Sequence, residues 1–234
     1  MIVERHPALR IDRRRIGAEG APLLVVDDFV ADPDRLVRKA ARSRFSPQGA
    51  MFPGVRARAP LSYEVLLEGL LRPLLPALGL RPGRFAFPMC HYSLVVQRPE
   101  TLSFLQRVPH IDSTTAQGLA TVHYLFRGDW GGTAFYRHRA TGYEVVDEAR
   151  RVAYFAQLQR ESEGAQAPAA GYIGGDTELF ERIGAVAGAF NRLVVYRRNS
   201  LHSGDIDNAR VPPPDPVAGR LSINSFIDVL DPGP

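Results

Sequence analysis

Three residues that lie far apart in the chain constrain its fold more than any other feature: His110, Asp112 and His202. Two histidines and one carboxylate make up the facial triad that holds a mononuclear iron(II) ion and leaves the opposite side of the ion open. In an extended segment, residues i and i+2 point to the same side, so His110 and Asp112 can reach one ion. His202 must then come from a distant strand folded against that segment, which predicts a β-rich fold.

A second feature strengthens this interpretation. The segment 219–227 is typical of a strand, and Arg220 is its first inward-facing residue. The planar guanidinium of an arginine near such an iron suits the distal carboxylate of 2-oxoglutarate. Ser222 and Asn224 share the face of Arg220 because side chains alternate along a strand, so we expect them to line the same site.

Each candidate residue also has a plain structural interpretation. Asp112 could cap a solvated turn, and His202 could be an ordinary loop histidine. Arg220 could pair with Asp228 or with a glutamate on a neighbouring strand. A lone H-x-D motif is weak, because three residues match by chance in many chains. The joint occurrence of both histidines, the carboxylate and the arginine favours the metal site.

Further motifs carry a resemblance to a known family. Residues from about Cys90 to Phe226 resemble the catalytic double-stranded β-helix of the 2-oxoglutarate/Fe(II) dioxygenases, and are most similar to the prolyl-4-hydroxylase-like branch. Thr121-Val122-His123-Tyr124-Leu125 resembles the T-x-x-Y-L strand of that family, Gly131-Gly132-Thr133-Ala134-Phe135 its G-G-x-x-F hairpin, and Gly219-Arg220 its carboxylate clamp. The segments between the hairpin and His202, and between His202 and Arg220, are longer than is usual there.

The resemblance implies a chemistry. Iron(II) would be held by His110, Asp112 and His202, and the co-substrate 2-oxoglutarate by Arg220 together with Tyr124 and Ser222, the residues that we expect to bind it. With dioxygen, such a site hydroxylates a C–H bond of an amino acid, a peptide side chain or a small metabolite. The protein would then be an oxidoreductase of the dioxygenase type, a hydroxylase. Halogenation is disfavoured because the carboxylate ligand is intact.

Two other classes stay open at this point. One is a non-catalytic jelly-roll binding protein that uses the pocket for a small acid. The other is a cupin-type metalloenzyme that does not use 2-oxoglutarate, for which Arg220 should be dispensable. Independently of the class, Tyr124 could be an ordinary core residue whose hydroxyl is satisfied by the backbone.

Composition excludes other functions. The chain of 234 residues carries a formal net charge of +4, and its arginines are scattered apart from Arg13-Arg14-Arg15. We therefore expect no nucleic-acid partner, but a small-molecule or peptide substrate. No run of about twenty apolar residues predicts a membrane span, and no signal peptide is evident. The one cysteine, Cys90, fits a reducing compartment, so we expect a cytoplasmic protein; the oligomeric state stays open.

The resemblance and the residue pattern together predict an α+β protein, with a double-stranded β-helix (jelly-roll) core, N-terminal helices and a helical insertion. We expect a single domain over 1–234, with N-terminal helical support at 1–84 and a core at 85–230. The N-terminal part begins with a strand pair within 1–26. A helix follows, with Asp32 as its N-cap and Pro33 at its first position.

The remaining expectations concern connections. Residues 45–59 are typical of a loop, and 62–78 of two short helical pieces broken by prolines. We expect the insertion, 143–190, to contain helices over 146–159 and 176–190, joined by a loop at 164–175, and to lie beside the mouth of the site. The proline-rich stretch 211–216 cannot join a sheet and should form a stiff wall.

Overall fold

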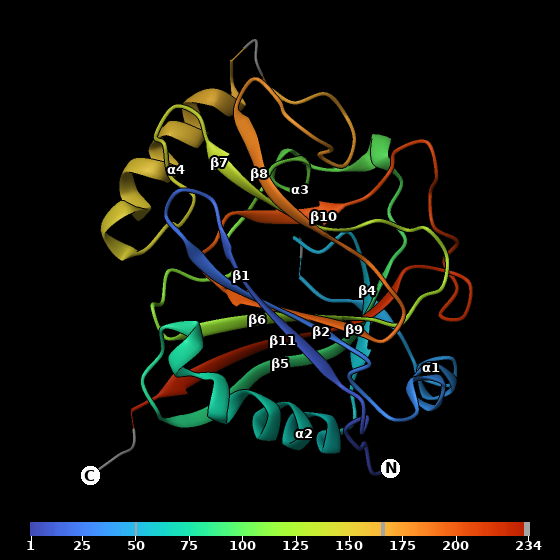
Figure 1. The fold of residues 1–234 in the computed structure, drawn as a ribbon. Coiled ribbons are helices and arrows are strands. Elements are labelled where there is room, and N and C mark those ends of the chain that lie inside the picture. The colour runs from blue at the N-terminus through green and yellow to red at the C-terminus, as the bar shows by residue number, and fades with distance from the viewer. Residues whose placement is uncertain (50, 165–166, 232–234) are drawn as a thin grey trace.

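Two antiparallel sheets face each other across the molecule, as Figure 1 shows for a computed structural model that describes residues 1–49, 51–164 and 167–231. The larger sheet has the strand order β1-β2-β9-β6-β11-β5-β4-β3, and the smaller has the order β10-β7-β8. From β6 onward the chain passes repeatedly between the sheets: β6, β9 and β11 lie in the larger one, and β7, β8 and β10 in the smaller one, as in a double-stranded β-helix. The predicted α+β jelly-roll fold is therefore confirmed.

The strands of the larger sheet are β1 (Arg10–Ile16), β2 (Ala21–Asp27), β3 (Ser46–Pro47), β4 (Gly54–Arg58), β5 (Arg84–Val95), β6 (Gly118–Tyr124), β9 (Arg192–Arg197) and β11 (Leu221–Leu230). Those of the smaller sheet are β7 (Gly132–His138), β8 (Phe180–Ala187) and β10 (His202–Asp205). The α-helices are α1 (Pro33–Ala40), α2 (Leu61–Leu71), α3 (Phe104–Arg107) and α4 (Glu148–Ser162). Three short 3-10 helices are η1 (Arg72–Leu74), η2 (Pro76–Leu78) and η3 (Pro99–Thr101).

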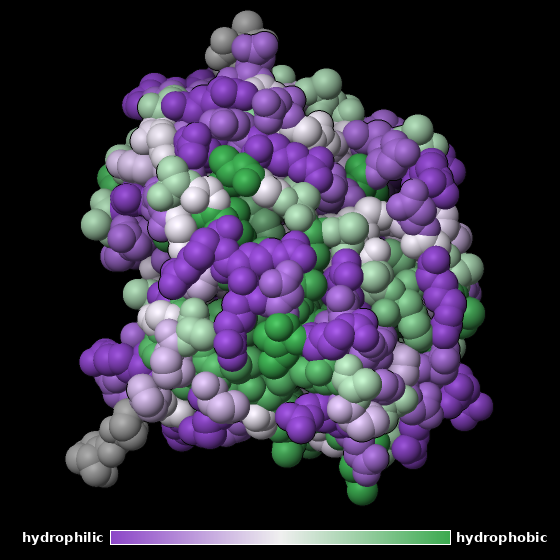
Figure 2. All heavy atoms as spheres, viewed as in Figure 1, coloured by the Kyte–Doolittle hydropathy of each residue, from purple (hydrophilic) through white to green (hydrophobic). Residues whose placement is uncertain are grey.

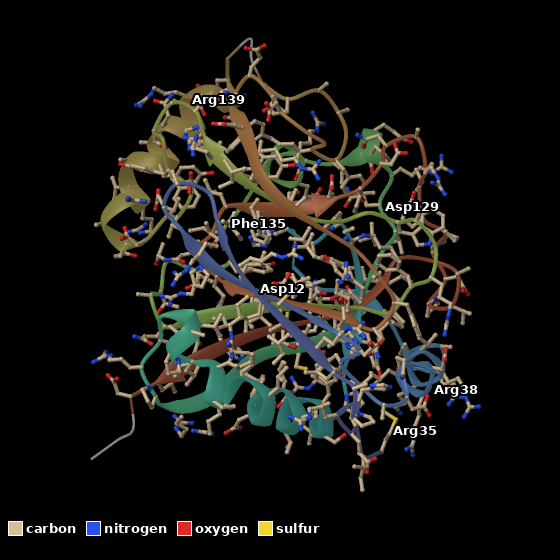
Figure 3. The ribbon with its side chains drawn as sticks, viewed as in Figure 1. Asp12, Arg35, Arg38, Asp129, Phe135 and Arg139 are labelled. Carbon is tan, nitrogen blue, oxygen red and sulfur yellow. The ribbon has the colours of Figure 1, made fainter. Side chains whose placement is uncertain are left out.

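The N-terminal strand pair forms one edge of the larger sheet. In β1 the charged residues are exposed while Ile16 is buried. Figure 2 shows hydrophilic side chains across the middle of this face, where β1 lies, and Figure 3 labels Asp12 on that strand. Charged side chains on an edge strand discourage pairing with another chain. The run Arg13-Arg14-Arg15 therefore has a structural explanation.

The opposite edge corrects one expectation. Residues 45–59, expected as a loop, contain β3 and β4, and β4 pairs with β5. The loop prediction was wrong for 46–47 and 54–58 because short edge strands carry no clear alternation, and their pairing is decided by the neighbouring strand. This correction matters because β4 carries Arg56, which faces the interior of the fold.

Helices cover the outer face of the larger sheet. Asp32 caps α1 as predicted, since its side chain accepts a hydrogen bond from the Arg35 N–H, and Pro33 occupies the first turn. Helix α2 gives way to 3-10 turns at the predicted prolines. Below the sheet in Figure 1, α2 buries Leu67 and Leu71 in the main hydrophobic cluster together with strand residues such as Ile223. The outer face of the larger sheet is therefore packed into a hydrophobic core.

The segment 143–190 also differs from expectation. Helix α4 agrees with the helix predicted over 146–159, but the helix predicted over 176–190 was wrong: β8 lies there and pairs with β7. Tertiary pairing has overridden the helical propensity of this stretch. Helix α4 packs Tyr154 and Leu158 against the smaller sheet in the cluster that contains Tyr136 and Phe180. The loop expected at 164–175 lies partly outside the described residues.

Two smaller expectations can also be compared with the structure. Residues 211–216 join no strand, as their prolines predicted. Across the described ranges, no helix combines the length and the apolar character that crossing a membrane requires.

Candidate metal site and its cavity

The backbone brings the three predicted ligands together. His110 and His202 form an isolated antiparallel bridge, with N–H to O distances of 2.9 and 3.0 Å in the two directions. The Asp112 N–H then donates to the Arg198 carbonyl at 2.8 Å, beyond the end of β9. Hydrogen bonds to two distant segments therefore position the H-x-D stretch, which itself lies outside the named strands.

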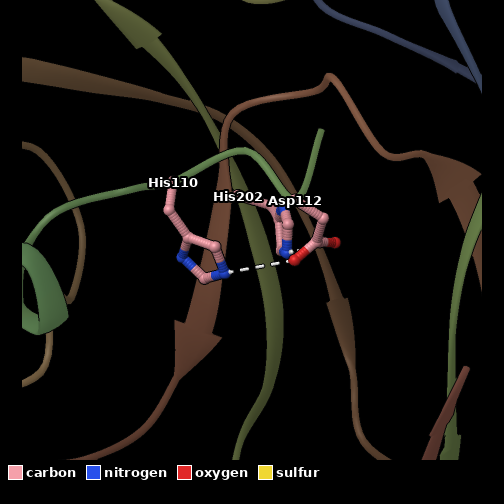
Figure 4. Close-up of side chains that lie close together, drawn as sticks. All are labelled: His110, Asp112 and His202. Atoms are coloured by element: carbon pink, nitrogen blue, oxygen red, sulfur yellow. Dashed lines mark ion pairs between the residues drawn. The ribbon is translucent and has the colours of Figure 1, made fainter. Parts of the chain in front are cut away.

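The side chains of these residues converge (Figure 4). His110 Nε2 lies 3.8 Å from Asp112 Oδ1, and His202 Nε2 lies 3.7 Å from Asp112 Oδ2. One donor atom from each residue can be chosen so that all lie within 4.8 Å of one another. The Asp112 and His202 side chains are 9% and 7% exposed, while that of His110 is 39% exposed. The cluster is compact enough for one ion and is open on the His110 side.

Hydrogen bonding and charge both fit a metal. The His202 Nδ1–H donates to the Ser200 carbonyl at 3.0 Å, which leaves the Nε2 lone pair facing Asp112. Burial lowers the pKa of His202 to about 4, and burial together with the charge of His202 lowers the pKa of His110 to about 4. Both rings are therefore neutral near pH 7, as metal ligands must be.

Asp112 supplies the clearest indication that the cluster can bind a cation. Its Oδ2 is buried and has no hydrogen-bond partner among the described residues. Burial raises the pKa of this carboxyl, against the charges of His110, Arg198 and Arg56. An unpartnered buried carboxylate oxygen costs free energy, which a bound cation would offset. Two imidazoles and a carboxylate match a first-row divalent metal such as iron(II).

A cavity of about 320 Å³ opens from this cluster between the two sheets. Its walls include residues of both sheets, among them Thr133, Tyr196, His202 and Asn224. Phe135, labelled between the sheets in Figure 3, packs against the lining residue Tyr196, with their ring centroids 5.2 Å apart. A cavity of this size takes a small molecule.

Arg220 lines the same cavity and is 6% exposed. Its Nε–H donates to the Trp130 carbonyl at 2.9 Å and its Nη2–H to the Gly132 carbonyl at 2.6 Å. Gly131 between them has φ of +76°, and a Cβ there would lie 1.7 Å from the Asp205 carbonyl oxygen, so this connection requires glycine. It is not the expected hairpin, because it joins β6 of the larger sheet to β7 of the smaller one. Nη1 has no hydrogen-bond partner within the described ranges, so the guanidinium keeps donors for a ligand.

The other predicted co-substrate residues lie behind the cavity wall. Tyr124 and Ser222 are not among the lining residues, whereas Thr133 and Asn224 are. The Tyr124 hydroxyl lies 2.6 Å from Thr133 Oγ1, and Ser222 Oγ donates to Asn224 Oδ1 at 2.7 Å. Tyr124 and Ser222 thus hold polar groups that themselves face the cavity.

Sequence reasoning missed many of the lining residues, among them Arg56, Phe52 and Tyr172. The first two lie in the stretch that was expected to be a loop. Tyr172 belongs to the connection between α4 and β8, and among the described residues of 143–190 it is the one that lines the cavity. Helix α4 packs on the smaller sheet rather than at the cavity. No local pattern around these three residues marks them as cavity residues.

Fold and site together define a double-stranded β-helix protein with a two-histidine, one-carboxylate cluster in its central cavity. The chain belongs to a family of unknown function (DUF6445), whose model matches residues 7–227. No curated protein matches it.

Among solved structures, the chain is similar to the non-heme alpha ketoglutarate dependent epimerase SnoN from nogalamycin biosynthesis, with a TM-score of 0.45 and 13% identity over 89% of this chain and 77% of that one. It is also similar to the non-heme alpha ketoglutarate dependent carbocyclase SnoK from nogalamycin biosynthesis, with a TM-score of 0.42 and 10% identity over 90% of this chain and 82% of that one. Identities this low transfer no activity.

Proposed function

We propose that the protein is an iron(II)- and 2-oxoglutarate-dependent oxygenase that oxidises a C–H bond of a small molecule, an amino acid or a peptide side chain. One observation carries this proposal. A single cavity has a two-histidine, one-carboxylate cluster on one wall, and it also contains a buried arginine whose Nη1 has no partner in the described part of the chain. The motif likeness to the prolyl-4-hydroxylase-like branch supports hydroxylation as the reaction.

The residues present have distinct tasks in this proposal. His110, Asp112 and His202 hold the metal, and Ser200 fixes the His202 ring through Nδ1. Arg220 binds the distal carboxylate of 2-oxoglutarate, while its hydrogen bonds to the Trp130 and Gly132 carbonyls hold the guanidinium in place. When bound, iron(II) supplies the redox chemistry by which dioxygen oxidises both 2-oxoglutarate, to succinate and carbon dioxide, and the substrate.

The direct test measures succinate release from 2-oxoglutarate by purified protein with iron(II) in air. We expect release that requires the metal and is lost in Asp112→Ala. Arg220→Leu should weaken 2-oxoglutarate binding by about 10- to 100-fold and leave metal binding intact, since it removes a charge-assisted pair. Arg220→Lys should restore only part of this affinity, because an ammonium lacks the planar fork.

The same measurements separate the alternatives. A non-catalytic binding protein would bind 2-oxoglutarate or another small acid and release no succinate. A cupin-type metalloenzyme that ignores 2-oxoglutarate would bind the metal normally and be indifferent to Arg220→Leu. Either outcome would contradict the proposal. Melting temperatures of the Arg220 variants serve as the folding control, because Arg220 also donates hydrogen bonds to the Trp130 and Gly132 carbonyls.

A further inference from the structure

The cavity contains a second arginine that the proposed metal and co-substrate chemistry does not use. Arg56 on β4 lines it and is half-buried. Its Nε–H donates to Ser93 Oγ at 3.3 Å, and its guanidinium lies 4.2 Å from the centre of the Phe52 ring. No carboxylate of the described residues pairs with it. A cation that is partly removed from water without a counter-ion costs free energy, which an anionic ligand would recover.

Strand register separates Arg56 from Arg220. Arg56 pairs with Ser93 on β5, and Ser93 pairs with Ser222 on β11. Arg220 lies immediately before β11 and two residues before Ser222, so the two arginines start from neighbouring rows on the inner face. Two separate anionic groups can therefore be bound, one at each arginine.

The two cavity arginines respond to different charges. The pKa of Arg56 is lowered by burial and raised by the charge of Asp112, so this arginine is influenced by the metal-site carboxylate. The pKa of Arg220, also lowered by burial, is instead raised by Tyr124, Tyr172 and Asp205. Apart from the predicted metal ligands, the charged residues of the cavity wall are these two arginines. The two arginines and iron(II) carry more positive charge than the Asp112 carboxylate and doubly charged 2-oxoglutarate can balance. One positive charge in the cavity therefore stays uncompensated.

Phe52, whose ring lies beside the Arg56 guanidinium, also packs against an apolar cluster in the cavity wall. Val95, Tyr172 and Ile206 belong to one hydrophobic cluster, with Phe52 packed against it, and all four line the cavity. Tyr172 is held firmly: its hydroxyl donates to the Gln97 carbonyl at 2.7 Å, and its backbone exchanges two hydrogen bonds with the Asn208 side chain. A cation beside a fixed apolar wall suits an organic acid with an apolar body.

We propose that Arg56 binds the carboxylate of the primary substrate, so that the protein acts on a small organic acid whose apolar part packs against Tyr172 and Ile206. Asn224 is a further donor for this ligand: its Oδ1 accepts from Ser222, and its Nδ2 has no partner within the described ranges. The inference rests on the proposed function, because it assigns 2-oxoglutarate to Arg220 and the substrate to Arg56.

The test compares acids with their neutral amides. Binding of 3-phenylpropanoate and hexanoate, each beside its amide, is measured by calorimetry on protein loaded with manganese(II), with and without 2-oxoglutarate, in the absence of oxygen. We expect at least one acid to bind about tenfold or more tightly than its amide, as a charge-assisted pair implies. Arg56→Met, which keeps a stem over Phe52, should bring the ratio to within about threefold and leave 2-oxoglutarate binding unchanged.

Two further variants complete the design. Arg58→Met is the matched control on the same strand, since Arg58 is exposed, pairs with Glu64 and is no lining residue. It should keep the acid preference. Arg56→Lys retains the charge and should keep part of the preference, which separates loss of binding from loss of folding.

Several results would overturn the inference. These are an acid preference that persists in Arg56→Met, an absence of any preference in the wild-type protein, or a loss of 2-oxoglutarate binding in Arg56→Met. The last result would make Arg56 the co-substrate anchor. Failure of the proposed function looks different: 2-oxoglutarate would not bind or would give no succinate, while the acid preference measured on the manganese-loaded protein would still depend on Arg56.

Discussion

Histidines on opposite sides of the larger sheet have different surroundings. On the outer side, His123 of β6 packs between Phe29 and Tyr63, with ring-centroid distances of 5.1 and 5.8 Å, and its Nε2 lies 3.2 Å from Asn191 Oδ1. On the inner side, His110 and His202 face a cavity, with ring centroids 4.4 Å apart.

Burial alone does not distinguish the two groups. It lowers the pKa of His123 to about 3, and those of His110 and His202 to about 4. What differs is the surroundings. Aromatic rings pack against His123, while the inner pair lies beside the Asp112 carboxylate, whose Oδ2 has no hydrogen-bond partner among the described residues, and faces a cavity. A perturbed pKa is therefore a weak sign of function unless an accessible, unpartnered group accompanies it.

The largest effect is expected on the inner side. Asp112→Ala should weaken metal binding by about 1000-fold, since loss of a ligand costs more than the 10- to 100-fold typical of residues that only support ligands. The metal-free variant should keep its stability to within about 1 kcal/mol, because the lost carboxylate was buried without a partner for Oδ2. Calorimetric metal titration and chemical denaturation measure both quantities. A strongly destabilised metal-free variant would show that Asp112 is structural.

The next effect belongs to the outer side. His123→Ala should lower the free energy of unfolding by about 3 kcal/mol, because it leaves a cavity between Phe29 and Tyr63 and removes the bond to Asn191. Metal binding should stay within about twofold of the wild type. Urea denaturation and metal titration give the two values. Loss of metal affinity in this variant would mean that the two sides are coupled.

Acid pH should sharpen the contrast. The pKa of His123 is about 3 in the folded protein and about 6.5 in the unfolded chain, so between these values the unfolded chain binds the additional proton. Stability therefore falls as pH falls through this window, by about 1.4 kcal/mol per pH unit from this residue. Denaturation of metal-free protein between pH 4 and 6 should show a slope in His123→Ala that is shallower by about this amount. Equal slopes would mean that His123 is protonated in the folded state.

The smallest effect concerns Tyr124, which neighbours His123 in sequence but points to the inner side. Tyr124→Phe removes the hydroxyl that lies 2.6 Å from Thr133 Oγ1, and should cost about 1 kcal/mol of stability. The affinity for 2-oxoglutarate should change by no more than about threefold, because Thr133 rather than Tyr124 lines the cavity. A tenfold or larger loss would place the tyrosine in contact with the co-substrate.

Much of the fold could be predicted because some signals are local. Alternation along a strand predicted that Asn224 lines the same site as Arg220, and the cap at Asp32 and the prolines after α2 acted within a few residues. The failures were nonlocal. Strand β8 was expected as a helix because its own residues do not reveal that it pairs with β7. The edge strand β4 was expected as a loop for the same reason, since its pairing with β5 leaves no local signal.

The sequence by itself determined which groups are available for chemistry: two imidazoles, one carboxylate and an arginine at the start of a strand. Tertiary structure decided which of them meet. The bridge between His110 and His202 and the shared cavity of Arg220 and Arg56 depend on hydrogen-bond register between strands that are distant in the chain. Such register is set by packing of the whole sheet, since a slip of one residue would turn each side chain to the opposite face.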